Sequence, residues 1–110
     1  MLLMRILLDE CVDERLRHLL PEYDCQTARY AGFSGLKNGA LLLAAEAAGF
    51  DVLVTVDQNI PDQQALTHRR ISVLILCGRT NRLADLRPLA PAARATLVSM
   101  QPGQVARVRG

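Results

Sequence analysis

Short apolar runs alternate along this chain with segments whose apolar residues recur every three or four positions. The runs at residues 4–8, 52–56 and 71–77 are nearly continuous, which is typical of strands buried on both faces of a parallel sheet, and the first strand is predicted at residues 5–9. A weaker run at residues 25–29 contains polar positions and predicts an edge strand. Residues 104–108, which follow a Pro-Gly pair, predict an optional last strand.

Helices are predicted between these strands. Apolar residues from Val12 to Leu20 recur on one helical face, and Pro21 ends that helix. Asn38 is suited to cap the next helix, which is apolar on nearly every side and is therefore buried in the domain or covered by a second subunit. The remaining helical segments are predicted at residues 61–68, as a turn or short helix around 82–86 that Pro88 breaks, and at 91–100.

The alternation of strands and helices predicts one α/β domain that spans residues 1–110. We expect a three-layer α/β/α sandwich with a mainly parallel sheet of four or five strands. Right-handed crossovers favour the strand order 2-1-3-4, with a fifth strand at the end of the sheet. No repeat or linker interrupts the pattern.

The composition fits a compact domain in a reducing compartment. Half of the 110 residues are apolar, so a sizeable core can form, mainly from aliphatic side chains. Cys11, Cys25 and Cys77 are odd in number and lack close pairing, which predicts reduced and partly buried thiols. No stretch approaches the roughly 18 apolar residues of a membrane span. We therefore expect a cytoplasmic protein without membrane contact.

Positive charge is concentrated in the second half of the chain. Residues 1–55 carry five basic and eight acidic groups, whereas residues 56–110 carry eight basic and three acidic groups. Twelve of the thirteen basic residues are arginines, which favours contacts with phosphate or carboxylate, although a GC-rich genome is an equal explanation. Arg79 and Arg82 follow the fourth strand and are the residues expected to hold a nucleic-acid backbone.

Asp9 and Asp57 stand at corresponding places after two of the continuous apolar runs. Ligands of parallel sheets bind beyond the carboxyl ends of the strands, at the point where the strand order reverses. With the first and third strands adjacent, the two carboxylates are expected side by side and could hold Mg²⁺ or Mn²⁺. The alternatives are a strand-end acid for Asp9 and a turn-forming residue for Asp57.

Three further residues are candidates for this site. Glu10 could serve as an auxiliary acid or simply begin the following helix. Thr55 lies two residues before Asp57 and should project to the same side, where its hydroxyl could orient a carboxylate, unless it is an ordinary strand residue. Asn38 could cap its helix and also reach the site.

Several motifs in this chain resemble the PIN-like superfamily, specifically a small bacterial branch related to the toxin nucleases of toxin–antitoxin pairs. The motifs are Ile-Leu-Leu-Asp-Glu-Cys at 6–11, Gly-Leu-Lys-Asn-Gly-Ala-Leu-Leu at 35–42, Phe-Asp-Val-Leu-Val-Thr-Val-Asp at 50–57, and Gln63-Gln64. The resemblance implies a PIN-like fold and metal-dependent cleavage of RNA by clustered acids. Asp9 matches the first-strand acid and Asp57 the acid of the Thr-x-Asp element. Asn38 stands where many PIN proteins have Asp, so the acidic set is incomplete.

The leading hypothesis is a metal-dependent endoribonuclease-like domain. Asp9 and Asp57 are the predicted metal ligands and catalytic residues with Glu10, while Thr55 and Asn38 are supporting polar groups. The expected partners are an RNA substrate, an antitoxin protein and a second copy of the chain. A catalytically inactive PIN-like module that binds protein or RNA is the main alternative. A phosphoacceptor receiver domain would need a lysine after its fifth strand, and Lys37, the sole lysine, stands elsewhere.

Overall fold

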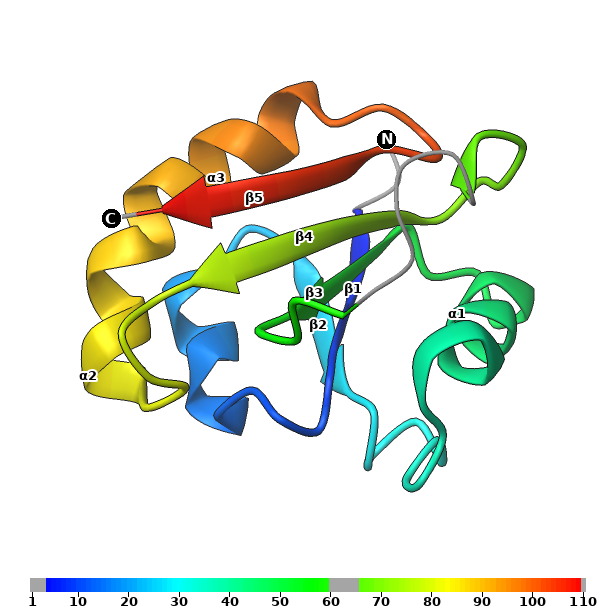
Figure 1. Cartoon of the computed structure of the whole chain (residues 1–110), viewed down its shortest axis with the longest axis horizontal. Helices are drawn as coiled ribbons and strands as arrows, with labels where there is room; N and C mark the ends of the chain where they lie inside the picture. Colours follow the sequence, from blue (N-terminus) through cyan, green and yellow to red (C-terminus); the bar gives the residue numbers. More distant parts are fainter. Residues whose placement is uncertain (1–3, 60–65, 110) are drawn as a thin grey trace.

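The computed structural model describes residues 4–59 and 66–109, except for the side chain of Asn38, and its strands form one parallel sheet (Figure 1). The strand order is β2-β1-β3-β4-β5, as predicted, and the fifth strand is present. All four neighbouring pairs are parallel. The strands are β1 (Arg5–Leu8), β2 (Asp24–Thr27), β3 (Val52–Thr55), β4 (Ser72–Cys77) and β5 (Val105–Arg109).

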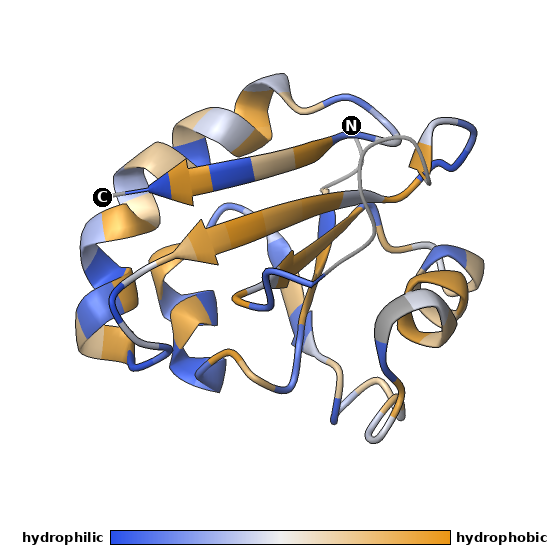
Figure 2. Ribbon diagram, viewed as in Figure 1, coloured by the Kyte–Doolittle hydropathy of each residue, from blue (hydrophilic) through white to orange (hydrophobic). Residues whose placement is uncertain are grey.

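The three central strands are apolar on both sides, because successive side chains point to opposite faces of the sheet and both faces are covered. Ile6, Leu8 and Val54 pack on the face that contacts the helical segments after β1 and β4. Leu7 and Leu53 pack on the other face. Figure 2 shows β4 apolar over most of its length, whereas polar positions interrupt the edge strand β5.

The first predicted helix is shorter and tighter than its apolar spacing suggests. It is a 3-10 helix, η1 (Glu14–Leu19), and it follows a turn in which the Asp13 carboxylate accepts a hydrogen bond from Arg15 N at 2.9 Å. Leu20 N closes the segment on Arg17 O, three residues back. The segment buries Leu16 without forming a regular α-helix.

Helix α1 (Asn38–Ala47) covers the face opposite η1. Its N-cap is Lys37, whose side chain makes no capping hydrogen bond, so the predicted cap at Asn38 was wrong by one residue. Gly49 follows the helix with φ of 87°, a left-handed conformation that favours glycine. The helix buries Leu41, Leu42 and Ala45 against the sheet and leaves the opposite side exposed.

The segment after β4 is helical almost without interruption. It consists of α2 (Leu83–Leu86), the 3-10 turn η3 (Arg87–Leu89) and α3 (Ala90–Ser99). The prediction that Pro88 breaks this segment was wrong. Pro88 lies in the first turn of η3, where its missing N–H is not needed, and the chain continues directly into α3. The predicted helix at 61–68 lies mostly outside the described residues. Within the described ranges, no helix is long and apolar enough to span a membrane.

The order of the strands fixes where a site can form. From β1 the chain first pairs with β2 on one side, and β3 then pairs on the other side of β1. The carboxyl ends of β1 and β3 therefore meet at the switch point of the sheet. We call the side of the sheet where the strands end the carboxyl edge, and the side where they begin the amino edge.

Candidate functional site

The centre of the carboxyl edge is the hydroxyl of Thr55, the last residue of β3 and fully buried. It donates a hydrogen bond to Asp9 Oδ2 at 2.8 Å and accepts one from Asp57 N at 3.0 Å. The Cys11 thiol lies 3.5 Å from the same oxygen. Because the only hydroxyl proton goes to Asp9, the thiol is the donor in that contact. Thr55 therefore uses its full hydrogen-bonding capacity to hold the segment after β1 against the segment after β3.

Asp9 is the first residue after β1, and the register of the sheet brings it to Thr55. Its backbone N–H donates to Val54 O at 3.0 Å, which extends the pairing of β1 with β3 by one residue. Its Oδ1 accepts a hydrogen bond from Glu10 N at 2.7 Å. Both carboxylate oxygens of Asp9 are thus held in fixed positions, and each retains acceptor capacity, because a carboxylate oxygen has two lone-pair directions.

Asp57 combines two of the roles considered for it. Its Oδ1 accepts a hydrogen bond from Asn59 N at 2.8 Å, so the residue forms the turn that its sequence context suggests. Its backbone is nevertheless bound to the hydroxyl that holds Asp9. The structure therefore brings Asp9, Thr55 and Asp57 together, as the strand order implies.

Glu10 belongs to the same site although it is adjacent to Asp9 in the chain. The strand has ended at Leu8, so the alternation of faces no longer applies. Glu10 Oε1 accepts a hydrogen bond from Gly35 N at 2.6 Å, which ties the loop before α1 to the end of β1. Gly35 has φ of 84° and can present its N–H in this conformation.

The three carboxylates line one pocket of about 420 Å³. Within residues 4–59 and 66–109, no ion pair joins Asp9, Glu10 or Asp57 to a basic side chain. In the same ranges, no three side chains of His, Cys, Asp or Glu are grouped closely enough to hold a metal ion by themselves. Neighbouring polar groups order the carboxylates, but basic side chains do not neutralise them.

Cys11 was not among the residues predicted for the site. Burial raises the pKa of its thiol above the usual value, which keeps it protonated at neutral pH and suits its role as a donor to Thr55. Cys11, Cys25 and Cys77 are free and half-buried, as predicted. The sequence feature that could have identified Cys11 is its position two residues after Asp9.

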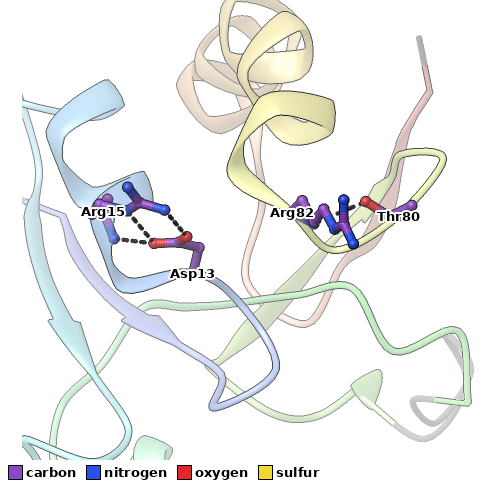
Figure 3. A network of polar contacts seen from close by, with 4 residues as sticks. All are labelled: Asp13, Arg15, Thr80 and Arg82. Carbon is purple, nitrogen blue, oxygen red and sulfur yellow. Dashed lines mark hydrogen bonds and ion pairs between the residues drawn. The ribbon is translucent and has the colours of Figure 1, made fainter.

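The remaining predicted residues are less closely connected to the acids. Asn38 is the first residue of α1, and its side chain lies outside what the structure describes. Arg79 and Arg82 are exposed in the loop after β4 and do not line the acidic pocket. Arg82 N donates to Thr80 Oγ1 at 3.0 Å at the start of α2 (Figure 3).

Figure 3 also shows how one nearby charge is neutralised. The Arg15 side chain donates to both carboxylate oxygens of Asp13, at 3.1 and 2.7 Å. This pairing, together with Arg15 N, lowers the pKa of Asp13 to about 2. Asp13 and Arg15 thus stabilise the start of η1. Unlike the unpaired carboxylates of the acidic pocket, Asp13 is already neutralised by a basic side chain.

Two basic residues near the acids were missed. Lys37 lines the acidic pocket, and Arg29 lines a neighbouring hollow together with Asp9 and Glu10. The strand-end rule could have found Arg29, because Ala28 N donates to Leu8 O at 2.8 Å and thereby places the end of β2 beside the end of β1.

Comparisons of this chain with models of protein families, with curated proteins and with solved structures gave no match.

Proposed function

We propose that this chain is a metal-dependent endoribonuclease-like domain with a three-layer PIN-like fold. The observation that supports the proposal is the Thr55 hydroxyl, which holds the Asp9 carboxylate and the Asp57 backbone at the switch point of the sheet. Glu10 lines the same pocket, and basic side chains of the described residues form no ion pair with these acids. Ordered carboxylates without a protein counter-charge are a suitable environment for a cation.

The chemical type of the candidate ligand atoms suits Mg²⁺ or Mn²⁺. All the candidate ligands are carboxylate oxygens, which these hard cations prefer. Mg²⁺ commonly binds proteins through one or two carboxylates and keeps several waters, so Asp9 and Asp57 suffice in number. When bound, such an ion supplies stabilisation of negative charge on a phosphoryl oxygen.

The residues of the chain would divide the remaining tasks. Asp9 and Asp57 hold the ion, and Thr55 fixes the orientation of Asp9 through a contact that is protected from water by burial. Glu10, anchored by Gly35, directs a carboxylate into the pocket and is the group that we assign as the auxiliary acid. The Asn38 side chain is proposed as a further polar support.

A catalytically inactive module that binds RNA or protein is the second candidate. It is favoured by the small acidic set, because the described residues contain no group of three ligating side chains. Such a module would keep the fold and the carboxyl-edge pocket without performing a reaction. The two candidates differ in whether metal binding is followed by cleavage.

Titration of Mn²⁺ into the wild-type chain and into Asp9→Asn distinguishes the candidates. We expect the wild type to bind the ion at or below millimolar concentration and to cleave single-stranded RNA, and Asp9→Asn to lose both properties. Asp51→Asn, at the amino edge, is the matched control and should retain them. Metal binding without cleavage would favour the inactive module, and no binding by the wild type would refute the metal site.

The biological setting is proposed on the same basis. The nuclease would act in the cytoplasm as the toxin of a toxin–antitoxin pair, so its expression should arrest growth in a manner that Asp9→Asn abolishes. A homodimer is proposed through the outer side of α1, where Leu43 is 52% exposed beside the exposed small residues Gly39, Ala40 and Ala47. Light scattering of the wild type and of Leu43→Glu tests that assembly.

A further inference from the structure

Two further hollows lie beside the acidic pocket, on the side toward β2, and the sequence did not indicate them. The pocket that contains Asp9 and Glu10 continues into a second hollow that both residues also line. This second hollow shares Thr27 and Arg29 with a third one, of about 560 Å³, along the exposed side of β2. The three hollows are therefore neighbours, and together they define a path from the carboxylates to the edge strand β2.

The turn after β2 is held rigidly beside the acids. Ala28 N donates to Leu8 O, the residue directly before Asp9, at 2.8 Å. The Thr27 hydroxyl accepts a hydrogen bond from Tyr30 N at 3.0 Å and fixes the turn that carries Arg29 and Tyr30. These side chains are therefore positioned by the backbone of the sheet.

Positive charge lies on both sides of the carboxylates along this path. Arg29 and Arg17 line the hollow at β2, and Lys37 lines the acidic pocket on the other side. All three are exposed, and none forms an ion pair within the described part of the chain. Free basic side chains on either side of a phosphodiester site can hold the phosphates before and after it.

Tyr30 completes the path. It lines the hollow beside β2 and is 81% exposed. An exposed aromatic ring next to free arginines is a suitable surface for a stacked base, because every base presents a flat face. Duplex nucleic acid does not offer its bases for stacking in this way, so the path selects a single strand.

We propose that single-stranded RNA follows this path, with Arg17 and Arg29 on its phosphates, a base on Tyr30 and Lys37 beyond the acids. The position of the strand relative to the carboxylates rests on the proposed function. Arg79 and Arg82, which were expected to hold the backbone, line none of these hollows. Glu14 lines two of the hollows and opposes binding.

Fluorescence anisotropy with a labelled single-stranded RNA tests the path, with EDTA present so that binding is measured without cleavage. The double variant Arg17→Gln/Arg29→Gln should raise Kd about tenfold at low salt and reduce the slope of log K against log salt by about 1.4. Tyr30→Leu should raise Kd about tenfold without a change in slope, because stacking releases no counterions. Glu14→Gln should tighten binding.

The double variant Arg79→Gln/Arg82→Gln is the matched control, since it removes the same charge outside the path, and it should change Kd by less than about twofold. A loss of affinity equal to that of Arg17→Gln/Arg29→Gln would refute the path, as would a wild type that does not bind RNA.

Cleavage in Mn²⁺ is assayed separately. If the wild type cleaves while Arg17→Gln/Arg29→Gln binds normally, the path is wrong and the proposed function stands. If the path residues govern binding but no cleavage occurs, the nuclease proposal fails and the path stands.

Discussion

The two edges of the sheet use charged residues in opposite ways. At the amino edge, Arg5 donates to Ala48 O at 2.7 Å, lies 3.6 Å from an Asp24 oxygen and stacks 4.4 Å from the Phe50 ring centre. Glu46 accepts from Arg70 N at 2.8 Å and pairs with Arg69 at 3.3 Å. At the carboxyl edge, hydrogen-bond donors orient three carboxylates, but within the described residues no basic side chain pairs with them.

This difference separates structural charges from candidate functional charges. A charge that is matched by a partner and by backbone groups contributes to stability and has little capacity left for a ligand. A carboxylate that is ordered but not neutralised costs stability and retains that capacity. Substitutions at the amino edge should therefore lower the stability of the fold, whereas charge-removing substitutions at the carboxyl edge should affect binding.

The largest expected effect is at the amino edge, in Gly103→Ala. Gly103 has φ of 76°, and an added Cβ would lie 2.5 Å from Leu66 O, so backbone must move. We expect a loss of about 3 kcal/mol in the free energy of unfolding, measured by urea denaturation. Gly32→Ala is the control, with φ of 85° but nothing within 4 Å of the added Cβ, and should cost about 1 kcal/mol. Equal losses would show that the close approach to Leu66 is unimportant.

Thr55→Val should combine a loss of stability with a loss of metal binding. Valine keeps the shape but leaves Asp57 N and Asp9 Oδ2 without their partner, which should cost about 2 kcal/mol. Thr55→Ser retains the hydroxyl and should retain Mn²⁺ affinity in calorimetric titration. Ser72→Ala, which removes a buried hydroxyl bonded to Gln101 O at the amino edge, should lower stability only. Normal Mn²⁺ binding by Thr55→Val would contradict the role of the hydroxyl.

Glu46→Gln should lower stability by about 1 kcal/mol at neutral pH, because the Glu46 carboxylate is bonded to two backbone N–H groups and paired with Arg69. These backbone hydrogen bonds, first that of Arg70, lower the pKa of Glu46 below its usual 4.5. The contribution is therefore complete above pH 4.5 and is lost as pH falls through the lower folded-state pKa.

Denaturation of Glu46→Gln and wild type over a pH series measures this effect. The difference in free energy should disappear in acid. Glu22→Gln removes an exposed ion pair with Arg94 and should change stability little at any pH. A difference between Glu46→Gln and wild type that persisted in acid would show that the charge is not the cause.

The smallest expected effect has the opposite sign. Asp57→Asn preserves the acceptor for Asn59 N but removes one of the unneutralised charges, so metal-free protein should gain about 0.5 kcal/mol. Thermal unfolding should then occur about 2 °C higher than in wild type. Added Mn²⁺ should raise the Tm of the wild type and not that of Asp57→Asn. A lower Tm of the metal-free variant would show that Asp57 is a structural residue.

Much of the fold could be predicted because local patterns have a direct physical cause. A short apolar run of mainly β-branched residues such as Val52–Thr55 favours a strand covered on both faces, and connection rules then restrict the strand order. The errors occurred where tertiary contacts decide local geometry. The segment at Glu14–Leu19 is a 3-10 helix that buries Leu16 despite its α-helical spacing, and Pro88 lies in the first turn of η3, which leads directly into α3.

Apolar patterning alone predicts that Asp9 and Asp57 follow adjacent strands, because strand ends and sheet order depend on that patterning. The groups that surround these acids could be identified only in the folded chain. The contact of Cys11 with Thr55, the bond from Gly35 to Glu10 and the position of Arg29 all join residues from separate segments. Their proximity depends on strand register and on the paths of loops, which have no local periodicity in the chain.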